Sequence, residues 1–264
     1  MTDHSSVWHF GLVAELWASF IPETPELEFL KEKIAQYGEP VLDVGCGVGR
    51  LLIALLQKGV DIDGVDISTD MLSACQEKLR RENLSTRLYE QPMSALQLPR
   101  PYKTIYICDS FGLAGSRQLD ELTLESVYRQ LLPGGVLILN KEAPYNLDDW
   151  SYWKKEERNK LPEPWPEESR RSLAEGGVEY ERWIRLLSID PLEQTCSLQI
   201  RVQKRMEGRV LAEEERTLVS NFYFRNELVA ILEKAGFREI AVYAGYSQQS
   251  ATADDEDLVY IAVK

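Results

Sequence analysis

The chain has 264 residues, of which 44% are hydrophobic and 28% are charged. This composition can supply a buried core, and it excludes a disordered or collagen-like protein. Its 30 Lys and Arg residues against 43 Asp and Glu residues give a formal net charge of −13. Because an acidic surface repels phosphate backbones and anionic lipid, we expect neither a nucleic acid nor a membrane as a partner.

The cysteines indicate a reducing compartment. They are Cys46, Cys75, Cys108 and Cys196. They form no CxxC pair and no ligand-like cluster with His4 or His9, so we expect no disulfide framework and no metal site. The N-terminus shows no basic segment followed by an apolar run, and we therefore expect no signal peptide and a cytoplasmic location.

Short apolar runs alternate with helical segments between residues 40 and 140. Strands are expected at 41–44, 61–65, 87–89, 104–108 and 136–140, and helices at 50–56, from Ser68 onward and at 119–131. Ser68 is a good N-cap for the second of these helices. Such alternation predicts a parallel, doubly wound α/β sheet with right-handed crossovers.

Residues 143–222 break this rhythm. Three long alternating runs at 178–189, 196–206 and 210–222, with turns at Asp190-Pro191 and Gly208, predict an antiparallel meander. The first pattern then returns, with a helix at 225–234 and strands at 239–243 and 258–263. We predict a helical cover over 1–36, a core made of 37–142 and 223–264, and an inserted antiparallel cap over 143–222. The cap is expected to bind the substrate or to mediate a homodimer.

The most informative motif follows the first predicted strand and reads Asp43-Val44-Gly45-Cys46-Gly47-Val48-Gly49. Glycines let the backbone turn tightly and approach a ligand closely. The fingerprint of a nicotinamide-dependent oxidoreductase needs a third glycine where Arg50 stands. An acid beside the turn, Asp43, also suits a ligand with an ammonium group better than a diphosphate.

A second carboxylate stands at the end of the second predicted strand. Asp66 follows the glycine motif by one β-α-β unit. A carboxylate at this place can accept both ribose hydroxyls of a nucleoside. A solvated loop Asp is the alternative for Asp66 alone, but together with the glycine turn it indicates a nucleoside site.

These motifs resemble those of the class I S-adenosylmethionine-dependent methyltransferases. Asp43–Gly49 looks like the first motif of that family, and Asp66 with Ser68 and Met71 looks like the second. Leu131–Val136 and Ala235–Phe237 resemble turns before the fifth and sixth strands of the family. The resemblance covers about 38–140 and 223–264. It implies a Rossmann-like, mostly parallel seven-stranded sheet and S-adenosylmethionine as the cofactor.

The resemblance also implies which residues hold that cofactor. Asp43 would lie beneath its methionine part, Asp66 would bind the ribose, and Ile67 would lie against the adenine. Pro92 departs from the family, which often has an acid there for the adenine amino group. The expected cofactor-binding residues are Trp17, Asp43, Gly45, Cys46, Gly47, Asp66, Ile67, Met71, Met93, Ser94 and Cys108. For Trp17, plain packing is the alternative role.

The implied reaction is an in-line methyl transfer, in which the protein mainly aligns and desolvates the reactants. A base is needed only if the acceptor must lose a proton, and we assign none. Asp109, after the fourth predicted strand, is the candidate for catalysis or for orienting the acceptor, with a solvated or helix-capping Asp as the alternative. The other expected acceptor contacts are Tyr145, Trp150, Trp153 and Arg201, although the tryptophans could instead pack the cap or form a dimer interface.

A dedicated cap predicts a small-molecule acceptor that is methylated on nitrogen or oxygen. A sensor that binds S-adenosylmethionine without catalysis is the second hypothesis, and a nicotinamide-dependent oxidoreductase is the third. No metal is expected, although Asp109, Glu142 and Asp148 could in principle cluster.

Overall fold

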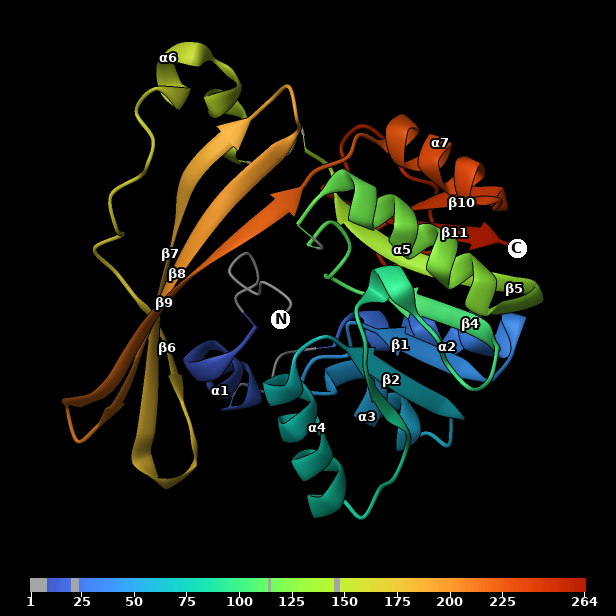
Figure 1. The fold of residues 1–264 in the computed structure, drawn as a ribbon, viewed down its shortest axis with the longest axis horizontal. Coiled ribbons are helices and arrows are strands. Elements are labelled where there is room, and N and C mark those ends of the chain that lie inside the picture. The colour runs from blue at the N-terminus through green and yellow to red at the C-terminus, as the bar shows by residue number, and fades with distance from the viewer. Residues whose placement is uncertain (1–8, 20–23, 114, 145–147) are drawn as a thin grey trace.

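The computed structural model describes residues 9–19, 24–113, 115–144 and 148–264. Its main sheet has seven strands in the order β10-β11-β5-β4-β1-β2-β3 (Figure 1). The strands are β1 (Val41–Val44), β2 (Ile62–Asp66), β3 (Leu88–Glu90), β4 (Tyr102–Ile107), β5 (Leu131–Glu142), β10 (Arg238–Ala244) and β11 (Asp257–Val263). The pairs β1–β2, β1–β4, β2–β3 and β4–β5 are parallel, and β11 runs antiparallel to both β5 and β10. The predicted mostly parallel, doubly wound sheet is confirmed.

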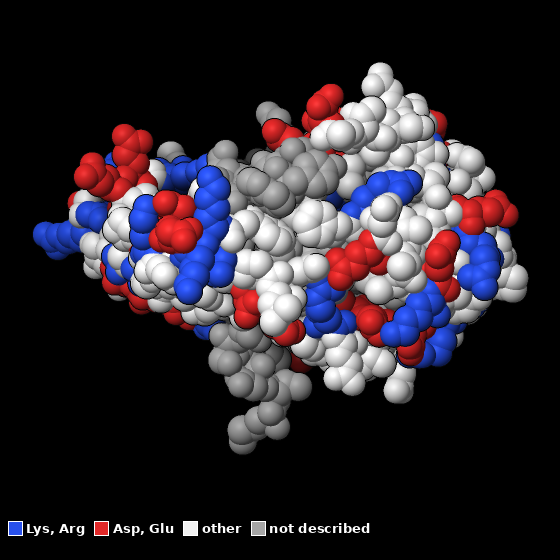
Figure 2. Space-filling view, turned by 90° about the horizontal axis from the view of Figure 1, so that it is seen from above, with Lys and Arg blue, Asp and Glu red and all other residues white. Residues whose placement is uncertain are grey.

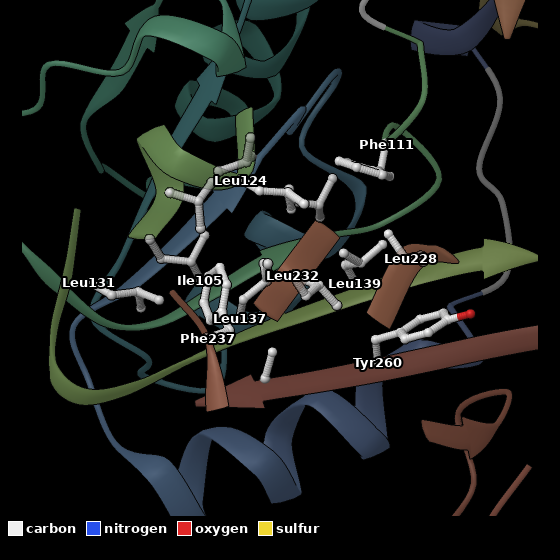
Figure 3. Packing of buried hydrophobic residues seen from close by; sticks show 14 of the residues in the cluster. Ile105, Phe111, Leu124, Leu131, Leu137, Leu139, Leu228, Leu232, Phe237 and Tyr260 are labelled. Carbon is white, nitrogen blue, oxygen red and sulfur yellow. The ribbon is translucent and has the colours of Figure 1, made fainter. Parts of the chain in front are cut away.

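Helices cover both faces of this sheet. They are α2 (Glu26–Tyr37), α3 (Arg50–Leu56), α4 (Thr69–Arg81), α5 (Arg117–Gln130) and α7 (Arg225–Ala235). Leu124 of α5 and Leu232 of α7 pack on one face of the sheet, in a cluster that Figure 3 shows from close by. Residues of α2, α3 and α4 form a second cluster on the other face. Burial on both faces explains why the strands read as continuous apolar runs.

The strand order reverses between β1 and β4. From β1 the chain continues outward to β2 and β3 on one side, whereas β4 and β5 extend the sheet on the other side. In open α/β sheets, ligands bind in the crevice that such a reversal leaves outside the carboxyl ends of the strands. The motifs after β1, β2 and β4 all stand at this edge.

The second sheet is antiparallel and has the order β6-β7-β8-β9. Its strands are β6 (Arg170–Leu173), β7 (Val178–Asp190), β8 (Thr195–Met206) and β9 (Arg209–Asn221), and all four lie between β5 and α7 in the chain. The predicted inserted meander is therefore present. It has one strand more than predicted, because the four residues of β6 include two arginines and are too short to show a clear alternation. Three short elements accompany the sheet: η2 (Asp148–Trp153), α6 (Lys155–Arg158) and η3 (Glu175–Gly177).

Helix α1 (Gly11–Ser19) lies between the second sheet and the core (Figure 1). Val13 and Leu16 pack on the sheet against Ile200 and Val202. From the opposite side of the helix, Ala14 contacts the core. The region 1–36 thus contains α1 and most of α2, and its role as a helical cover stays a prediction. Trp8 and Phe20 lie outside the described residues.

The outer face of the second sheet is charged. The space-filling view shows acidic and basic side chains intermixed at this end of the molecule and over the core (Figure 2). Arg201, for example, pairs with Glu215 on the neighbouring strand at 2.6 Å. The homodimer that we predict through this sheet stays a prediction.

A polar cluster around the buried Asp120 joins the second sheet back to the core. Asp120 of α5 is fully buried and accepts hydrogen bonds of 2.7 Å from Asn221 at the end of β9 and from Tyr223. Arg117 donates to the carbonyl of Phe222 at 2.9 Å and lies over the Tyr223 ring. These contacts hold the chain where it leaves the inserted sheet.

Most strand boundaries lie within two residues of the prediction, and the start of β5 differs by more. β5 begins at Leu131 rather than at 136, because Leu131 pairs with Tyr102 and the Pro133-Gly134-Gly135 segment forms an irregularity inside the strand. Within the described ranges, no helix combines the length and the apolar character needed to cross a bilayer.

Candidate active site

The glycine turn after β1 is open on one side and closed on the other. Gly45, Gly47 and Gly49 have φ angles of 75°, 52° and 82°, a region that L side chains rarely adopt. A β-carbon added at Gly45 would overlap the side chain of Ser110, which follows β4. At Gly47 an added β-carbon would meet nothing within 4 Å. Gly47 therefore borders empty space that a ligand can enter.

Asp66 is tied to this turn. Its carboxylate accepts hydrogen bonds of 2.8 Å from the backbone N–H groups of Gly47 and Ser68, one on each oxygen. Burial raises the pKa of Asp66, while these backbone bonds act in the opposite direction. Because an ionised carboxylate offers about four lone-pair sites, Asp66 can still accept a further hydrogen bond.

Asp43 lies beneath the turn. It is buried at 4% exposure and pairs in register with Tyr106 of β4. Desolvation by burial raises the pKa of Asp43 to about 7, and the nearby charge of Asp66 adds to the rise. A carboxyl group in this state can change its charge when a cation binds above it.

Trp17 and Met71 meet at the cover. Met71 of α4 is buried in a small cluster with Ala14 of α1 and Val48 of the glycine turn, and Trp17 packs against this cluster. On its sheet side, Trp17 lies 5.1 Å from the guanidinium of Arg182. Two residues expected at the cofactor thus come together where α1 meets α4.

The other expected cofactor residues take different positions. The Met93 methyl group, in η1 (Met93–Ala95), lies 3.8 Å from where a β-carbon of Gly45 would stand, and Ser94 and Ile67 are half-buried. The Cys46 side chain packs into the core against Gly64 of β2. The Cys108 sulfur, at the end of β4, accepts a hydrogen bond of 3.3 Å from the Tyr246 hydroxyl.

Asp109 stands at the carboxyl end of β4 with its side chain 62% exposed. Its backbone N–H donates to Oδ1 of Asn140 at 2.8 Å, and Nδ2 of Asn140 donates to Oδ1 of Asp109 at 2.7 Å. Arg50 lies 3.4 Å from the other carboxylate oxygen and forms two hydrogen bonds of 2.7 Å to the buried Glu26. Asp109, the candidate for orienting the acceptor, is thus held by β5 through Asn140 and by α3 through Arg50.

Two further acids, Glu142 and Asp257, lie at the ends of neighbouring strands, and together with Asp109 we call them the acidic rim. Glu142 at the end of β5 lies directly opposite Asp257 at the start of β11. Desolvation raises the pKa of both carboxyl groups, and the charge of Asp257 adds to the rise at Glu142. This edge of the sheet therefore favours a cation over an anion. In the part of the chain that the structure describes, no three acidic, His or Cys side chains are grouped to hold a metal ion.

The remaining acceptor residues do not gather at this edge. Arg201 alternates with Ile200 and Val202, which face α1, so it points to the opposite, outer face of the second sheet, where it also lies 4.2 Å from the Trp165 ring. Trp153 packs against Phe222 and Phe224. Tyr145 lies outside the described residues, and of Trp150 the structure describes only the backbone, in η2. A role of these residues at an acceptor stays a prediction.

Comparison with known proteins agrees with this geometry. Residues 41–135, which run from β1 into β5, match the family described as a methyltransferase domain. Residues 41–135 therefore form a methyltransferase domain.

Relatives and solved structures extend the comparison beyond the methyltransferase domain. A demethylmenaquinone methyltransferase of Lactobacillus johnsonii is 32% identical over 124 residues, which are 45% of this chain and 50% of that protein. The chain spans about half the length of the curated relatives it matches. The crystal structure of an S-adenosylmethionine-dependent methyltransferase from Clostridium acetobutylicum has a TM-score of 0.74 at 20% identity, covering 95% of this chain and 96% of that one. The sugar N-methyltransferase KedS8 from Streptoalloteichus has a TM-score of 0.72 at 18% identity, covering 100% and 98%. At such identities the last two matches show a shared fold, and their coverage includes the inserted sheet.

The residues of the methyltransferase domain fit S-adenosylmethionine. The open space beside Gly47 leaves room for a ligand that lies along the backbone, and the Asp66 carboxylate can accept a hydrogen bond from a ligand hydroxyl group. Asp43 and Asp66 are both acidic, which suits a cofactor that carries an ammonium and a sulfonium.

Sequence reasoning missed three residues at this edge of the main sheet. Ser110 covers Gly45, and Asn140 and Arg50 hold Asp109. Arg50 and Ser110 were visible only as neighbours of the glycine turn and of Asp109. Asn140 carries one available signal, since it is a polar residue at the end of the apolar run Val136–Leu139 and therefore at the carboxyl edge of the sheet.

Proposed function

We propose that this protein transfers the methyl group of S-adenosylmethionine to a nitrogen atom of a small-molecule amine, with oxygen as the alternative acceptor atom. One observation carries the choice. The exposed carboxylate of Asp109 is fixed beside the glycine turn, because the next residue, Ser110, lies over Gly45. A fixed carboxylate at the cofactor's edge can bind the ammonium form of an amine and guide it to the methyl group.

The cofactor would follow the three motifs. The Asp66 carboxylate would accept hydrogen bonds from the ribose hydroxyls, and Ile67 and Met71 would border the adenine. The methionine part would pass along Gly45 and Gly47, above Asp43. Asp43 would interact with the cofactor's ammonium group. Burial raises the pKa of Asp43 to about 7, and a cation bound above it would stabilise the charged carboxylate.

Bound S-adenosylmethionine supplies a methyl group on a positively charged sulfur, which is an intrinsically good leaving group. The protein then has two tasks, alignment and exclusion of water. The rim of Asp109, Glu142 and Asp257 would attract the protonated amine, and one of these carboxylates, or water, would take the proton that frees the nitrogen lone pair. The second sheet and α1 would cover the reacting atoms.

The comparisons are compatible with this acceptor class. KedS8 is a sugar N-methyltransferase, and it shares the fold of the whole described chain, the inserted sheet included. The methyltransferase match of residues 41–135 supports the reaction type, while the acceptor rests on the acidic rim.

The experiment is an acceptor screen with S-adenosylmethionine labelled by tritium in its methyl group. A panel of amino sugars and simple primary amines is compared with hydroxyl analogues of the same compounds, and Asp66→Ala serves as the control without cofactor binding. We expect label on an amine but not on its hydroxyl analogue. Transfer only to the hydroxyl compounds would select the oxygen alternative. Tight cofactor binding with no transfer to any compound would favour the sensor hypothesis instead.

A further inference from the structure

The contact between Asp109 and Asn140 links the ends of two neighbouring strands. Asn140 is buried at 6% exposure, and its backbone pairs with Val259 inside the sheet. It receives the backbone N–H of Asp109 and donates to the Asp109 carboxylate, over distances of 2.8 and 2.7 Å. A rigid strand residue thus holds an exposed acid by two hydrogen bonds.

The chemistry of the two groups fixes the orientation of the Asn140 amide. A backbone N–H can only donate, so the Asn140 oxygen must face it. An ionised carboxylate can only accept, so the Asn140 NH₂ group must face Asp109. The opposite amide orientation would lose both bonds.

Asp109 needs such support because of its backbone. Its φ is 57°, in the left-handed region that few residues with a β-carbon adopt, although Asp adopts it more often than most. Residues held in this region persist when the surrounding structure over-determines them, and they cluster at functional sites. Here the surrounding structure is Asn140 on one side and Arg50 on the other.

Arg50 connects this acid to the cofactor side. It is the first residue of α3, directly after the glycine turn. Its guanidinium is anchored by the buried Glu26, and from there it lies 3.4 Å from Oδ2 of Asp109. Both Asp109 oxygens therefore have a protein partner, yet the side chain stays 62% exposed and can accept another donor.

We propose that Asn140 and Arg50 are positioning residues that fix the Asp109 carboxylate where it binds the ammonium group of the acceptor. The inference rests on the proposed function and deepens it. Without Asn140, Asp109 loses both hydrogen bonds and relaxes to an ordinary backbone conformation, and its carboxylate leaves the acceptor position. We expect the cofactor site to form without Asn140.

The test compares Asn140→Ala with Thr104→Val. Thr104 is also buried and donates a side-chain hydrogen bond of 2.8 Å to Gly38, but it lies at the opposite end of β4. Steady-state kinetics use the amine with the highest turnover in the tritium screen, and calorimetry measures the affinity for S-adenosylmethionine. We expect Asn140→Ala to lower kcat/KM for the amine by about tenfold or more, mainly through KM, with cofactor affinity unchanged within about twofold. Thr104→Val should leave both values unchanged.

A charge swap separates positioning from structural support. The double substitution Asp109→Asn with Asn140→Asp restores complementary hydrogen bonds but moves the carboxylate to the other strand. Because position 140 is buried, the carboxylate there carries a desolvation cost, and we expect this variant to melt above Asn140→Ala and to keep the loss in kcat/KM. Recovery of wild-type kinetics by the swap, or wild-type KM in Asn140→Ala, would overturn the inference. If the wild type binds S-adenosylmethionine but methylates no compound, the proposed function fails and the inference falls with it.

Discussion

The backbone N–H of Gly47 donates a hydrogen bond of 2.8 Å to the carboxylate of Asp66. This bond joins the glycine turn after β1 to the acid at the end of β2. The same carboxylate accepts from Ser68, whose hydroxyl donates to the carbonyl of His9 before α1 at 2.6 Å. The turn, the acid and the N-terminal cover therefore form one connected unit around the open space at Gly47.

Alanine at Gly47 should separate binding from stability. An added β-carbon meets no atom there, so Gly47→Ala should cost only about 1–2 kcal/mol, from its positive φ. The methyl group would stand in the cofactor's space and lower the affinity for S-adenosylmethionine by about tenfold or more. Calorimetric titration and thermal unfolding measure the two effects.

Gly45→Ala is the matched comparison. Its added β-carbon would overlap the Ser110 side chain as well as require a positive φ, so we expect a loss of stability on the order of 3 kcal/mol. If Gly47→Ala bound the cofactor as the wild type does, the proposed path along the turn would be wrong.

Asp43 should make stability depend on pH. Its folded pKa of about 7 lies above its ordinary value, so the folded state holds a proton that the unfolded chain releases at lower pH. The free energy of unfolding should therefore fall as the pH rises from about 4 through 7 and level off above that. Urea denaturation of the wild type and Asp43→Asn at pH 5 and 8 isolates this contribution. The same change in the free energy of unfolding between the two pH values in both proteins would contradict it.

The same group should couple cofactor binding to pH. The ammonium of S-adenosylmethionine favours the charged carboxylate, so binding releases a proton when Asp43 starts out protonated. We expect affinity to rise with pH up to about 7 and then to level off. Calorimetry in buffers of different ionisation enthalpy counts the released protons, and Asp43→Asn should remove this release.

The polar cluster around Asp120, which joins α5 to the end of β9, should contribute strongly to the free energy of unfolding. Asp120→Ala leaves Asn221 and Tyr223 without their buried acceptor, and we expect a cost of about 2–4 kcal/mol. The adjacent substitution Glu121→Ala breaks only an exposed pair with Lys234 and should cost less than about 1 kcal/mol. Equal urea midpoints for the two variants would show that the polar cluster around Asp120 contributes little to stability.

Local signals in the chain are sufficient for most of the core. Asp43, Asp66 and the glycines between them follow strands, and the carboxyl ends of parallel strands meet at one edge, so their common location was predictable. The extra strand β6 was not, because four residues with two arginines carry too little periodicity. The early start of β5 depends on the pairing of Leu131 with Tyr102, a long-range contact with no local signal.

The acceptor side was predictable only in part. Asp109 stands out because it follows a strong strand, but the contacts that hold it come from Asn140 and Arg50, which are distant in sequence. The outward direction of Arg201 was available from its apolar neighbours Ile200 and Val202, since side chains alternate along a strand. A pairing between elements leaves no comparable trace in a single sequence.

The central claim is that Asp66 and the glycine turn hold S-adenosylmethionine. Calorimetric titration of the wild type and Asp66→Ala tests it most directly, with Asp61→Ala, an exposed acid just before the same strand, as the control. We predict saturable 1:1 binding to the wild type and to Asp61→Ala, and an affinity lower by about tenfold to a hundredfold in Asp66→Ala. No saturable binding to the wild type, or equal affinity in Asp66→Ala, would contradict the account.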